Sequence, residues 1–181
     1  SYERGQGVPM DISKAANLWR QACSAGDPNG CRWLGELKRT GRFDGTRDAA
    51  SGLKLIERGC EGEVAEYCVE AGNMHLAGEG TPKDLAAAKK LYERACSLPY
   101  LDCSGLARLH EAGEGVPKDP RRAAELYQKG CDRGSRWHLA ATHCAAAARL
   151  LRPPGTDPAP PPEEKPKPKR GAGKAPAPKK K

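Results

Sequence analysis

Residues 113–131 read GEGVPKDPRRAAELYQKGC, and this stretch decides the fold. A glycine turn leads into Asp119, and Leu126 and Tyr127 follow seven and eight residues after that aspartate. Positions 4, 7, 8 and 11 after the aspartate share one face of a helix with 3.6 residues per turn, so the stretch predicts an amphipathic helix. Asp119 suits its N-cap, because a carboxylate accepts the free N–H groups of a first turn, and Pro120 suits its first position.

The same pattern occurs four times along the chain. Each capping aspartate is followed after seven residues by leucine, after eight by a large side chain and after twelve by cysteine. Those cysteines lie 37, 36 and 35 residues apart. A period of this size is typical of a repeat array, in which each supersecondary unit stacks on its neighbours. The expected buried stripe comprises Leu18, Trp19, Leu55, Ile56, Leu91, Tyr92, Leu126 and Tyr127.

A second helix is expected in each unit, beginning near a second cysteine. It ends in a glycine turn, as at 78–82 and 113–117, whose first glycine suits a left-handed C-cap. The fourth unit has a longer loop, with 12 residues between its cysteines, and reads as the end of the array. The fourth position after the second cysteine holds only small residues, which predicts close approach of another helix there: Gly35, Gly72, Ala107 and Ala148.

The eight cysteines fall into four pairs that flank the turns between the two helices of a unit. Packed antiparallel helices can bring two Cα atoms within the roughly 4.4–6.8 Å that a disulfide spans. Zinc sites favour pairs separated by about two to five residues, which these pairs do not match. We therefore predict one disulfide per repeat, no metal, and an oxidising compartment, either the periplasm or the cell exterior. The pairs are Cys23/Cys31, Cys60/Cys68, Cys96/Cys103 and Cys131/Cys144.

The composition changes at the end of the repeats, which indicates a repeat domain over 1–152 and a separate tail over 153–181. The tail holds ten of the 16 prolines, carries a net charge of +5 and has no large apolar residue, so it is expected to be disordered. It could contact a polyanion by charge alone. Specific nucleic-acid binding is not expected, because the tail has no aromatic residue on which a base could stack.

The chain has no stretch that approaches the roughly 18–20 apolar residues of a membrane span. It begins at Ser1 in what looks like the end of a helix. We therefore expect a truncated first repeat, with any signal peptide outside this chain.

Residues 2–152 resemble the Sel-like repeat (SLR) family, a relative of the tetratricopeptide solenoids. The resemblance rests on Gly-x-Gly-Val-Pro-x-Asp over 113–119, Ala-Ala-x-Leu-Tyr-x-x-Gly over 123–130 and Leu-Ala-x-Leu over 106–109. Cysteine pairs with seven intervening residues resemble those of the cysteine-rich secreted bacterial branch of this family. The third pair, one residue short, and the irregular turn at 41–45 depart from the pattern. The resemblance implies an all-α fold, a right-handed α/α superhelical solenoid of helix-turn-helix repeats with a concave surface for a protein or peptide.

If the second helix of each unit lines that surface, its exposed positions lie one, five and eight residues after the cysteine. The function we expect is an extracytoplasmic protein- or peptide-binding scaffold that needs no cofactor. The alternative, implied by cysteine-rich members of the family, is a β-lactam (penicillin)-binding protein with slow β-lactamase activity. The groove candidates are Arg32, Glu36, Arg39, Asn73, Ser104, Arg108 and Glu111.

Two further patterns carry a possible chemistry. Ser51-Gly-Leu-Lys54 matches the Ser-x-x-Lys of serine β-lactamases, but the chain has no Ser-Asp-Asn or Lys-Thr-Gly companion, so no catalytic residue is predicted. His75 and His110 occupy one repeat position and could meet as metal ligands or as an acid–base pair. The alternative is a packing position that tolerates several side chains, since the preceding unit has Lys38 there.

Overall fold

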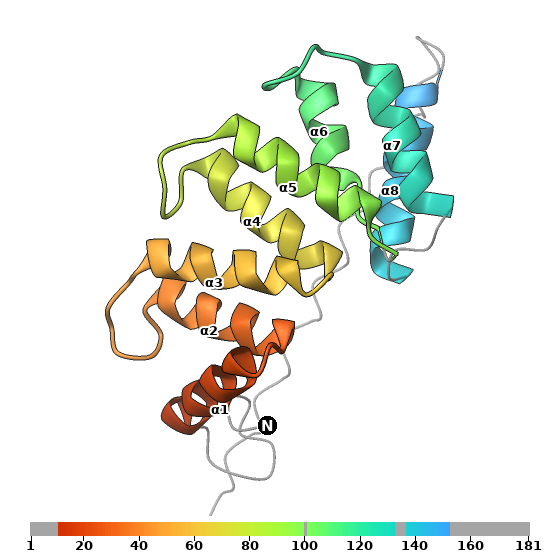
Figure 1. Cartoon of the computed structure of the whole chain (residues 1–181). Helices are drawn as coiled ribbons and strands as arrows, with labels where there is room; N and C mark the ends of the chain where they lie inside the picture. Colours follow the sequence, from red (N-terminus) through yellow and green to blue (C-terminus); the bar gives the residue numbers. More distant parts are fainter. Residues whose placement is uncertain (1–10, 100, 133–136, 153–181) are drawn as a thin grey trace, which may run out of the picture.

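The computed structural model describes residues 11–99, 101–132 and 137–152, the side chains of 137–140 excepted. Within these ranges the chain forms eight helices and no strand, and each helix packs chiefly on its neighbours in sequence. Figure 1 shows the helices stacked in chain order from α1 to α8. The predicted tail at 153–181 lies outside the described residues. The helices are α1 (Ile12–Ser24), α2 (Pro28–Thr40), α3 (Ala49–Glu61), α4 (Ala65–Ala77), α5 (Leu85–Ser97), α6 (Ser104–Ala112), α7 (Pro120–Asp132) and α8 (Trp137–Leu151).

The four aspartates cap the odd-numbered helices as predicted. Each carboxylate accepts the backbone N–H three residues ahead at 2.9–3.0 Å, which satisfies one of the free donors of the first turn. Three of the aspartates also donate their own backbone N–H to a carbonyl near the end of the preceding helix. Those carbonyls belong to Lys38, His75 and His110, which explains why this repeat position accepts different side chains.

Glycine ends three of the even-numbered helices. Gly41, Gly78 and Gly113 have φ values of 70°, 72° and 78°, in the left-handed region where other residues are strained. The left-handed cap predicted from the glycine turns is therefore confirmed at Gly78 and Gly113. It also holds at Gly41, although that turn is irregular in sequence.

The column of small residues lets successive repeats approach closely. A Cβ at Gly35 would lie 2.8 Å from Cγ1 of Ile56 on α3, and a Cβ at Gly72 would overlap the ring of Tyr92 on α5. Ala107 is fully buried. Ala148 occupies the same position on α8 but is exposed, because the described chain has no later helix to cover it.

One expectation was wrong. Leu18 lies on the predicted buried stripe, but 51% of its surface is exposed, whereas Leu126 at the equivalent position is 5% exposed. The equivalent leucines pack on the preceding repeat, and the described chain has no helix before α1. The expected longer loop of the fourth unit falls on 133–136, which lie outside the described residues. Part of the long spacing between its cysteines belongs to α8, which begins seven residues before Cys144.

Each predicted disulfide is present and lies within its own repeat. The Cα–Cα distances are 4.4, 4.6, 4.4 and 4.9 Å in chain order, and no cysteine is free. Each bridge fastens the end of an odd-numbered helix to the even-numbered helix that follows. The molecule is thus an all-α solenoid of helix pairs with one disulfide per repeat.

The second cysteine of each of the first three pairs is buried in the core. The sequence interpretation, which placed these cysteines beside a turn, is corrected in this respect. Cys31 is 1% exposed, and Cys68 and Cys103 are 0% exposed. Cys31 and Cys68 do not open their helices, because α2 begins at Pro28 and α4 at Ala65, about one turn earlier. Only Cys103 stands directly before its helix, as the N-cap of α6. Because each bridge joins the facing sides of two packed helices, these three cysteines belong to the core and present no surface to a ligand.

Candidate functional site

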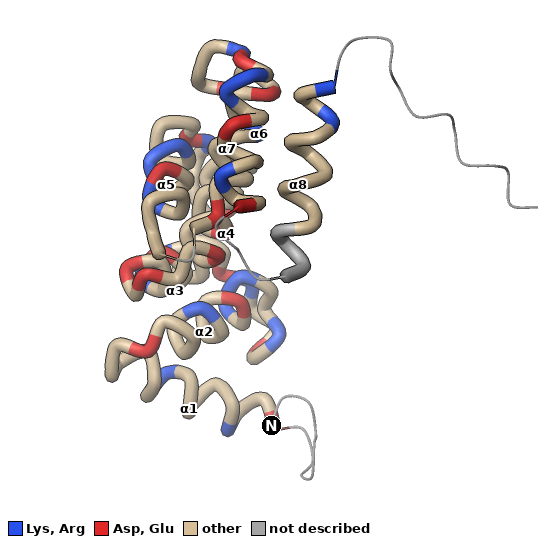
Figure 2. The backbone as a smooth tube through the Cα atoms, turned by 90° about the vertical axis from the view of Figure 1, so that its right-hand side faces the viewer, with Lys and Arg blue, Asp and Glu red and all other residues tan. Residues whose placement is uncertain are grey.

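A row of polar side chains joins the even-numbered helices to one another, and we call this surface the ladder face. Figure 2 shows α3 and α5 at one side of the array, α8 at the other, and basic and acidic residues interspersed along it. Each contact of the row connects a helix to the corresponding part of the next repeat, 35 to 40 residues later in the sequence. The ladder face comprises Asn29, Arg32, Glu36, Arg39, Tyr67, Glu70, Asn73, Glu79, Arg108, Glu111 and Arg149.

Glu79, in the turn after α4, anchors the ladder between α2 and α4. It accepts from Nη1 of Arg39 at 3.1 Å and from Nη2 of Arg47 at 2.8 Å, while Arg39 also pairs with Glu36. Burial acts to raise the pKa of Glu79, but the hydrogen bonds from Arg47 and Arg39 outweigh it and hold that pKa below its usual value. The carboxylate is therefore ionised at neutral pH, and its two arginines are held in place.

An aromatic and cationic stack lies at the α1 end of the ladder face. The rings of Trp19 and Trp33 stack with centroids 5.7 Å apart, and the Arg32 guanidinium carbon lies 4.4 Å from the centroid of Trp33. The same guanidinium is 5.9 Å from the ring of Tyr67 and pairs with Glu70 at 3.0 Å. The stack runs through α1, α2 and α4, so it fixes Arg32 between two aromatic faces.

Between α4 and α6, Asn73 is the centre of the ladder. Its Oδ1 accepts from the Tyr92 hydroxyl at 2.8 Å and from Nη2 of Arg108 at 2.6 Å. Asn73 and Arg108 are exposed, whereas Tyr92 is fully buried. The buried tyrosine thus positions two polar side chains at the surface.

Between α6 and α8, Glu111 takes the corresponding role. Its Oε1 accepts from Nη2 of Arg149 at 2.6 Å, and its Oε2 lies 3.5 Å from the Tyr127 hydroxyl. Burial and the Glu111 charge both raise the pKa of Tyr127. The phenol therefore stays protonated and available to donate to Glu111 at neutral pH.

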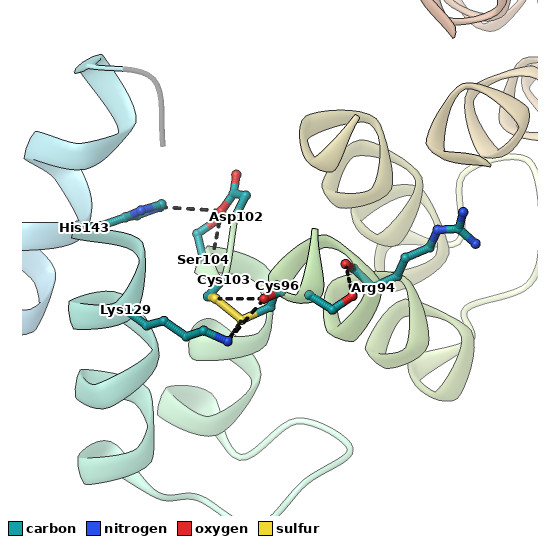
Figure 3. Close-up of a disulfide and its surroundings, with 8 residues drawn as sticks. Arg94, Cys96, Asp102, Cys103, Ser104, Lys129 and His143 are labelled. Atoms are coloured by element: carbon teal, nitrogen blue, oxygen red, sulfur yellow. Dashed lines mark hydrogen bonds and ion pairs between the residues drawn. A yellow bond between two sulfur atoms is a disulfide. The ribbon is translucent and has the colours of Figure 1, made fainter. Parts of the chain in front are cut away.

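A buried polar pair lies beside the third disulfide, as Figure 3 shows. Asp102 and His143 are 4% and 2% exposed, and Oδ1 of Asp102 lies 3.5 Å from Nε2 of His143. Asp102 also accepts the backbone N–H of Ser104 at 2.9 Å, and Nζ of Lys129 donates to the Cys96 carbonyl at 3.3 Å. These contacts fasten α8 and α7 to the loop between α5 and α6.

Two of the residues with a catalytic or metal pattern, Ser51 and His75, are in structural contacts, whereas Nδ1 of His110 is buried with no described hydrogen-bond partner. Ser51 donates its backbone N–H to Asp48, and its hydroxyl also hydrogen-bonds that carboxylate, which lowers the pKa of Asp48. Lys54 is exposed. Nε2 of His75 lies 2.7 Å from Oε1 of Glu57 on α3. No cluster of three or more His, Cys, Asp or Glu residues that could hold a metal ion occurs in the described part of the chain.

The structure joins some of the predicted groove candidates directly and others through partners that the sequence analysis missed. Arg39 pairs with Glu36, and Asn73 with Arg108. Ser104 has its backbone N–H bonded to Asp102. The side-chain partners that were missed are Asn29, Arg47, Tyr67, Glu70, Glu79, Tyr92, Tyr127 and Arg149.

The position rule used for the candidates would have found Arg149, since it lies five residues after Cys144. It could not find Glu79, because that residue lies in a turn. None of the described helices is long and apolar enough to cross a bilayer.

Comparison with known proteins places this geometry in a family. The Sel1 repeat model matches residues 1–27, 28–63, 65–100 and 103–135. Cytochrome c oxidase assembly factor 7 of Xenopus tropicalis and assembly factor 7A of Xenopus laevis are each 30% identical to the chain over 114 residues, 59% of this chain. The chain spans about half, 49%, of those two relatives.

Two solved structures share the fold. A Sel1 repeat protein from Oxalobacter formigenes has a TM-score of 0.64 at 23% identity, covering 83% of this chain and 69% of that one. The uropathogenic Escherichia coli protective antigen c5321, which has an SLR fold, has a TM-score of 0.62 at 20% identity, covering 82% of this chain and 36% of its own.

Proposed function

The chain belongs to the Sel1 repeat family, and from this premise we propose that it is an interaction scaffold, which holds a protein or peptide segment on its ladder face. The observation that carries the proposal is the continuity of that face across α2, α4, α6 and α8. Repeat arrays use such extended surfaces for binding. Side chains that are already fixed by their neighbours lose less conformational entropy when a ligand binds.

The names of two relatives agree with this proposal. Both are called assembly factors of cytochrome c oxidase, and assembly of an enzyme complex is carried out through contacts between proteins. The likeness covers about half of each relative, so it supports the class of activity and leaves the identity of the partner to experiment.

We place the scaffold in an oxidising compartment outside the cytoplasm. All eight cysteines are in disulfides, and such bridges persist in secreted and periplasmic proteins but are rare where glutathione and thioredoxin keep thiols reduced. Alkylation of the protein in freshly opened cells, followed by mass spectrometry, should find no modified cysteine. Eight modified cysteines would contradict the compartment.

Ser51 gives no support to β-lactam hydrolysis, because its described contacts are with Asp48, the N-cap of α3, and none is with Lys54. We expect the oxidised protein not to turn over nitrocefin. Turnover that disappears in a fully folded ladder-face variant would instead favour an enzyme.

The binding proposal is tested by photo-crosslinking from the two sides of the array. A benzoylphenylalanine residue at Ser104 or Arg149 lies on the even-numbered helices, and one at Lys54 or Lys90 lies on exposed positions of α3 and α5. We expect the same discrete partner to crosslink from the first two positions and not from the second two. Equal crosslinking from all four positions, or crosslinking from α3 and α5 alone, would overturn the proposal.

A further inference from the structure

Arg108 differs from the other arginines on and beside the ladder face. Those arginines each lie within 3.1 Å of a glutamate carboxylate, whereas Arg108 is in ion-pair contact with no carboxylate among the described residues. Its hydrogen-bond partners among the described residues are neutral groups, the amide oxygen of Asn73 and the hydroxyl of Tyr92. The arginines that are paired are Arg32, Arg39, Arg47 and Arg149.

The nearby carboxylates do not compensate Arg108. Glu111, one turn further along α6, is already bonded to Arg149 and lies beside the Tyr127 hydroxyl. Burial is the main cause that raises the pKa of Tyr92, and the charge of Glu114, in the turn after α6, adds to it, but no ion pair between Glu114 and Arg108 is described. The ladder face therefore carries a positive charge at this one point that the described residues do not neutralise.

The orientation of Asn73 follows from its partners. A guanidinium has only donors, so the atom of Asn73 that faces it at 2.6 Å must be the amide oxygen. The Tyr92 hydroxyl bonds the same oxygen, and burial raises the pKa of Tyr92, which keeps the hydroxyl protonated. The Nδ2 amino group of Asn73 is consequently left with two N–H donors and no described acceptor.

The Tyr92 ring that supports the Asn73 amide is held rigidly. The Tyr92 ring is fully buried, and a Cβ added at Gly72 or at Gly105 would overlap it, so the ring is clamped between α4 and α6. A displacement of Asn73 would break the hydrogen bond of a buried hydroxyl. The donors of Asn73 and Arg108 are therefore fixed beside each other before any ligand binds.

We infer that Asn73 and Arg108 form a carboxylate-binding site for an acidic side chain in an extended segment of a partner protein. One carboxylate oxygen accepts from the free guanidinium N–H groups of Arg108, and the other accepts from Nδ2 of Asn73, which are charge-assisted hydrogen bonds of the strong kind. Among the described residues the ladder continues on both sides, toward Glu70 and toward Arg149, which favours a segment that runs through the site over a chain terminus that ends in it. This inference rests on the proposed binding function of the ladder face.

The probe for the test is a fluorescein-labelled octapeptide of alternating Glu and Gly with an amidated C-terminus. Fluorescence anisotropy is measured with the full-length oxidised protein at physiological salt. We expect Arg108→Gln to weaken binding about tenfold or more, because it removes the charge-assisted hydrogen bonds of the site. Asn73→Asp should weaken it similarly, because the new carboxylate keeps the Tyr92 contact and itself pairs with Arg108.

The matched control is Arg122→Gln, which removes the same charge from the exposed face of α7. It should change the affinity less than twofold, and the basic tail contributes equally to every variant. Equal losses in Arg108→Gln and Arg122→Gln would mean that the probe binds by overall charge, which overturns the assigned site. Unchanged circular dichroism and thermal midpoints show that each variant is folded.

Two further peptides separate the remaining outcomes. The same peptide with Gln in place of Glu should not bind, and the Gln peptide with a free C-terminal carboxylate should not bind either. Binding of the latter alone would mean capture of a chain terminus and would overturn the inference. If a partner still crosslinks from Ser104 and Arg149 in the Arg108→Gln protein, the proposed scaffold function stands and the carboxylate-binding site is overturned.

Discussion

Glu79 accepts hydrogen bonds from two arginines of different segments, so one carboxylate ties the end of α2 and the turn before α3 to the turn after α4. Its pKa is lower in the folded protein than in the unfolded chain, where a glutamate has a pKa of about 4.3. The stabilisation is therefore complete above that unfolded pKa and is lost as the pH falls through the folded pKa.

We expect Glu79→Gln to remove this part of the pH dependence. Above the unfolded pKa, where the wild-type carboxylate is ionised, the variant should be less stable by about 0.5–1 kcal/mol, the upper range for a partly exposed ion pair. At lower pH, once Glu79 is protonated, the two proteins should converge. Urea unfolding across this range measures the difference, and Glu125→Gln on exposed α7 is the control. A constant difference at all pH values would show that the charge of Glu79 is not responsible.

The absence of a side chain at Gly72 sets the spacing of two repeats. In Gly72→Ala the new Cβ overlaps the buried Tyr92 ring, which also packs closely against Gly105. Overpacking of a core costs about 1–3 kcal/mol, more than the roughly 1 kcal/mol that alanine gains over glycine in a helix. We expect a net loss of stability in urea unfolding.

Ala148→Leu is the matched change at the same repeat position on α8, where the site is exposed. It should alter the free energy of unfolding by less than about 0.5 kcal/mol, as is usual for surface substitutions. If both variants are equally destabilised, the close approach of the repeats is not what requires the small residue.

At the scale of the element, α8 depends on contacts that lie outside the repeating pattern. Asp102 bonds both the first turn of α6 and His143 of α8, and both side chains are almost fully buried. Loss of Asp102 removes a buried carboxylate that accepts from the first turn of α6 and faces His143, and a hydrogen bond to a carboxylate is worth about 1.5–3 kcal/mol. We expect Asp102→Ala to destabilise the protein by about 2–4 kcal/mol in urea unfolding and to loosen α8 in particular.

Asp27→Ala is the control that separates the bond of Asp102 to the first turn of α6 from its contact with His143. Asp27 also accepts the backbone N–H two residues ahead, from Asn29, but its side chain is exposed and has no histidine partner. This variant should lose only the contribution of a cap, about 1 kcal/mol. Equal losses in Asp27→Ala and Asp102→Ala would mean that the His143 contact adds nothing.

The elements that the sequence predicts well are those with a strong local cause. The aspartate caps, the left-handed glycines and the disulfides each follow from residues close together in the chain. The starts of the even-numbered helices were less predictable. Cys31 and Cys68 mark where two helices touch, about one turn inside α2 and α4, and Trp137 extends α8 beyond the register set by the other repeats. The exposure of Leu18 depends on what precedes the helix, and the helix itself carries no signal of it.

The candidate site was predictable in position but not in pairing. The columns of the even-numbered helices place Asn73 and Arg108 on one surface, yet their contact depends on Tyr92, which the sequence assigns only to the core. Glu79 was missed for a different reason: its role depends on a turn geometry that brings it within reach of Arg39, 40 residues away. Contacts between repeats follow from the superhelix as a whole and have no local sequence signal.

At the scale of the whole molecule, a solenoid is nearly one-dimensional, because each described repeat contacts chiefly its neighbours. Its stability is then a sum of units and interfaces, and the four disulfides each act on one unit. Closing a loop of this size is worth roughly 2.5–3 kcal/mol in the chain-entropy model. Removal of one bridge should therefore loosen the molecule locally, and the extent of loosening should depend on where the bridge lies.

We compare two double variants, Cys60→Ala/Cys68→Ala in the middle of the array and Cys131→Ala/Cys144→Ala at its end. The first bridge is buried in a core shared with α5 and α6, so its loss should increase hydrogen exchange in α3 and α4 and also in those neighbours. The second should increase exchange in α7 and α8 and leave α1 to α4 protected. Uniform loss of protection in both variants would mean that the array unfolds as a single cooperative unit. The ladder face would then fold and unfold as a whole. With local loosening instead, a partner could bind the α1 end while the α8 end is open.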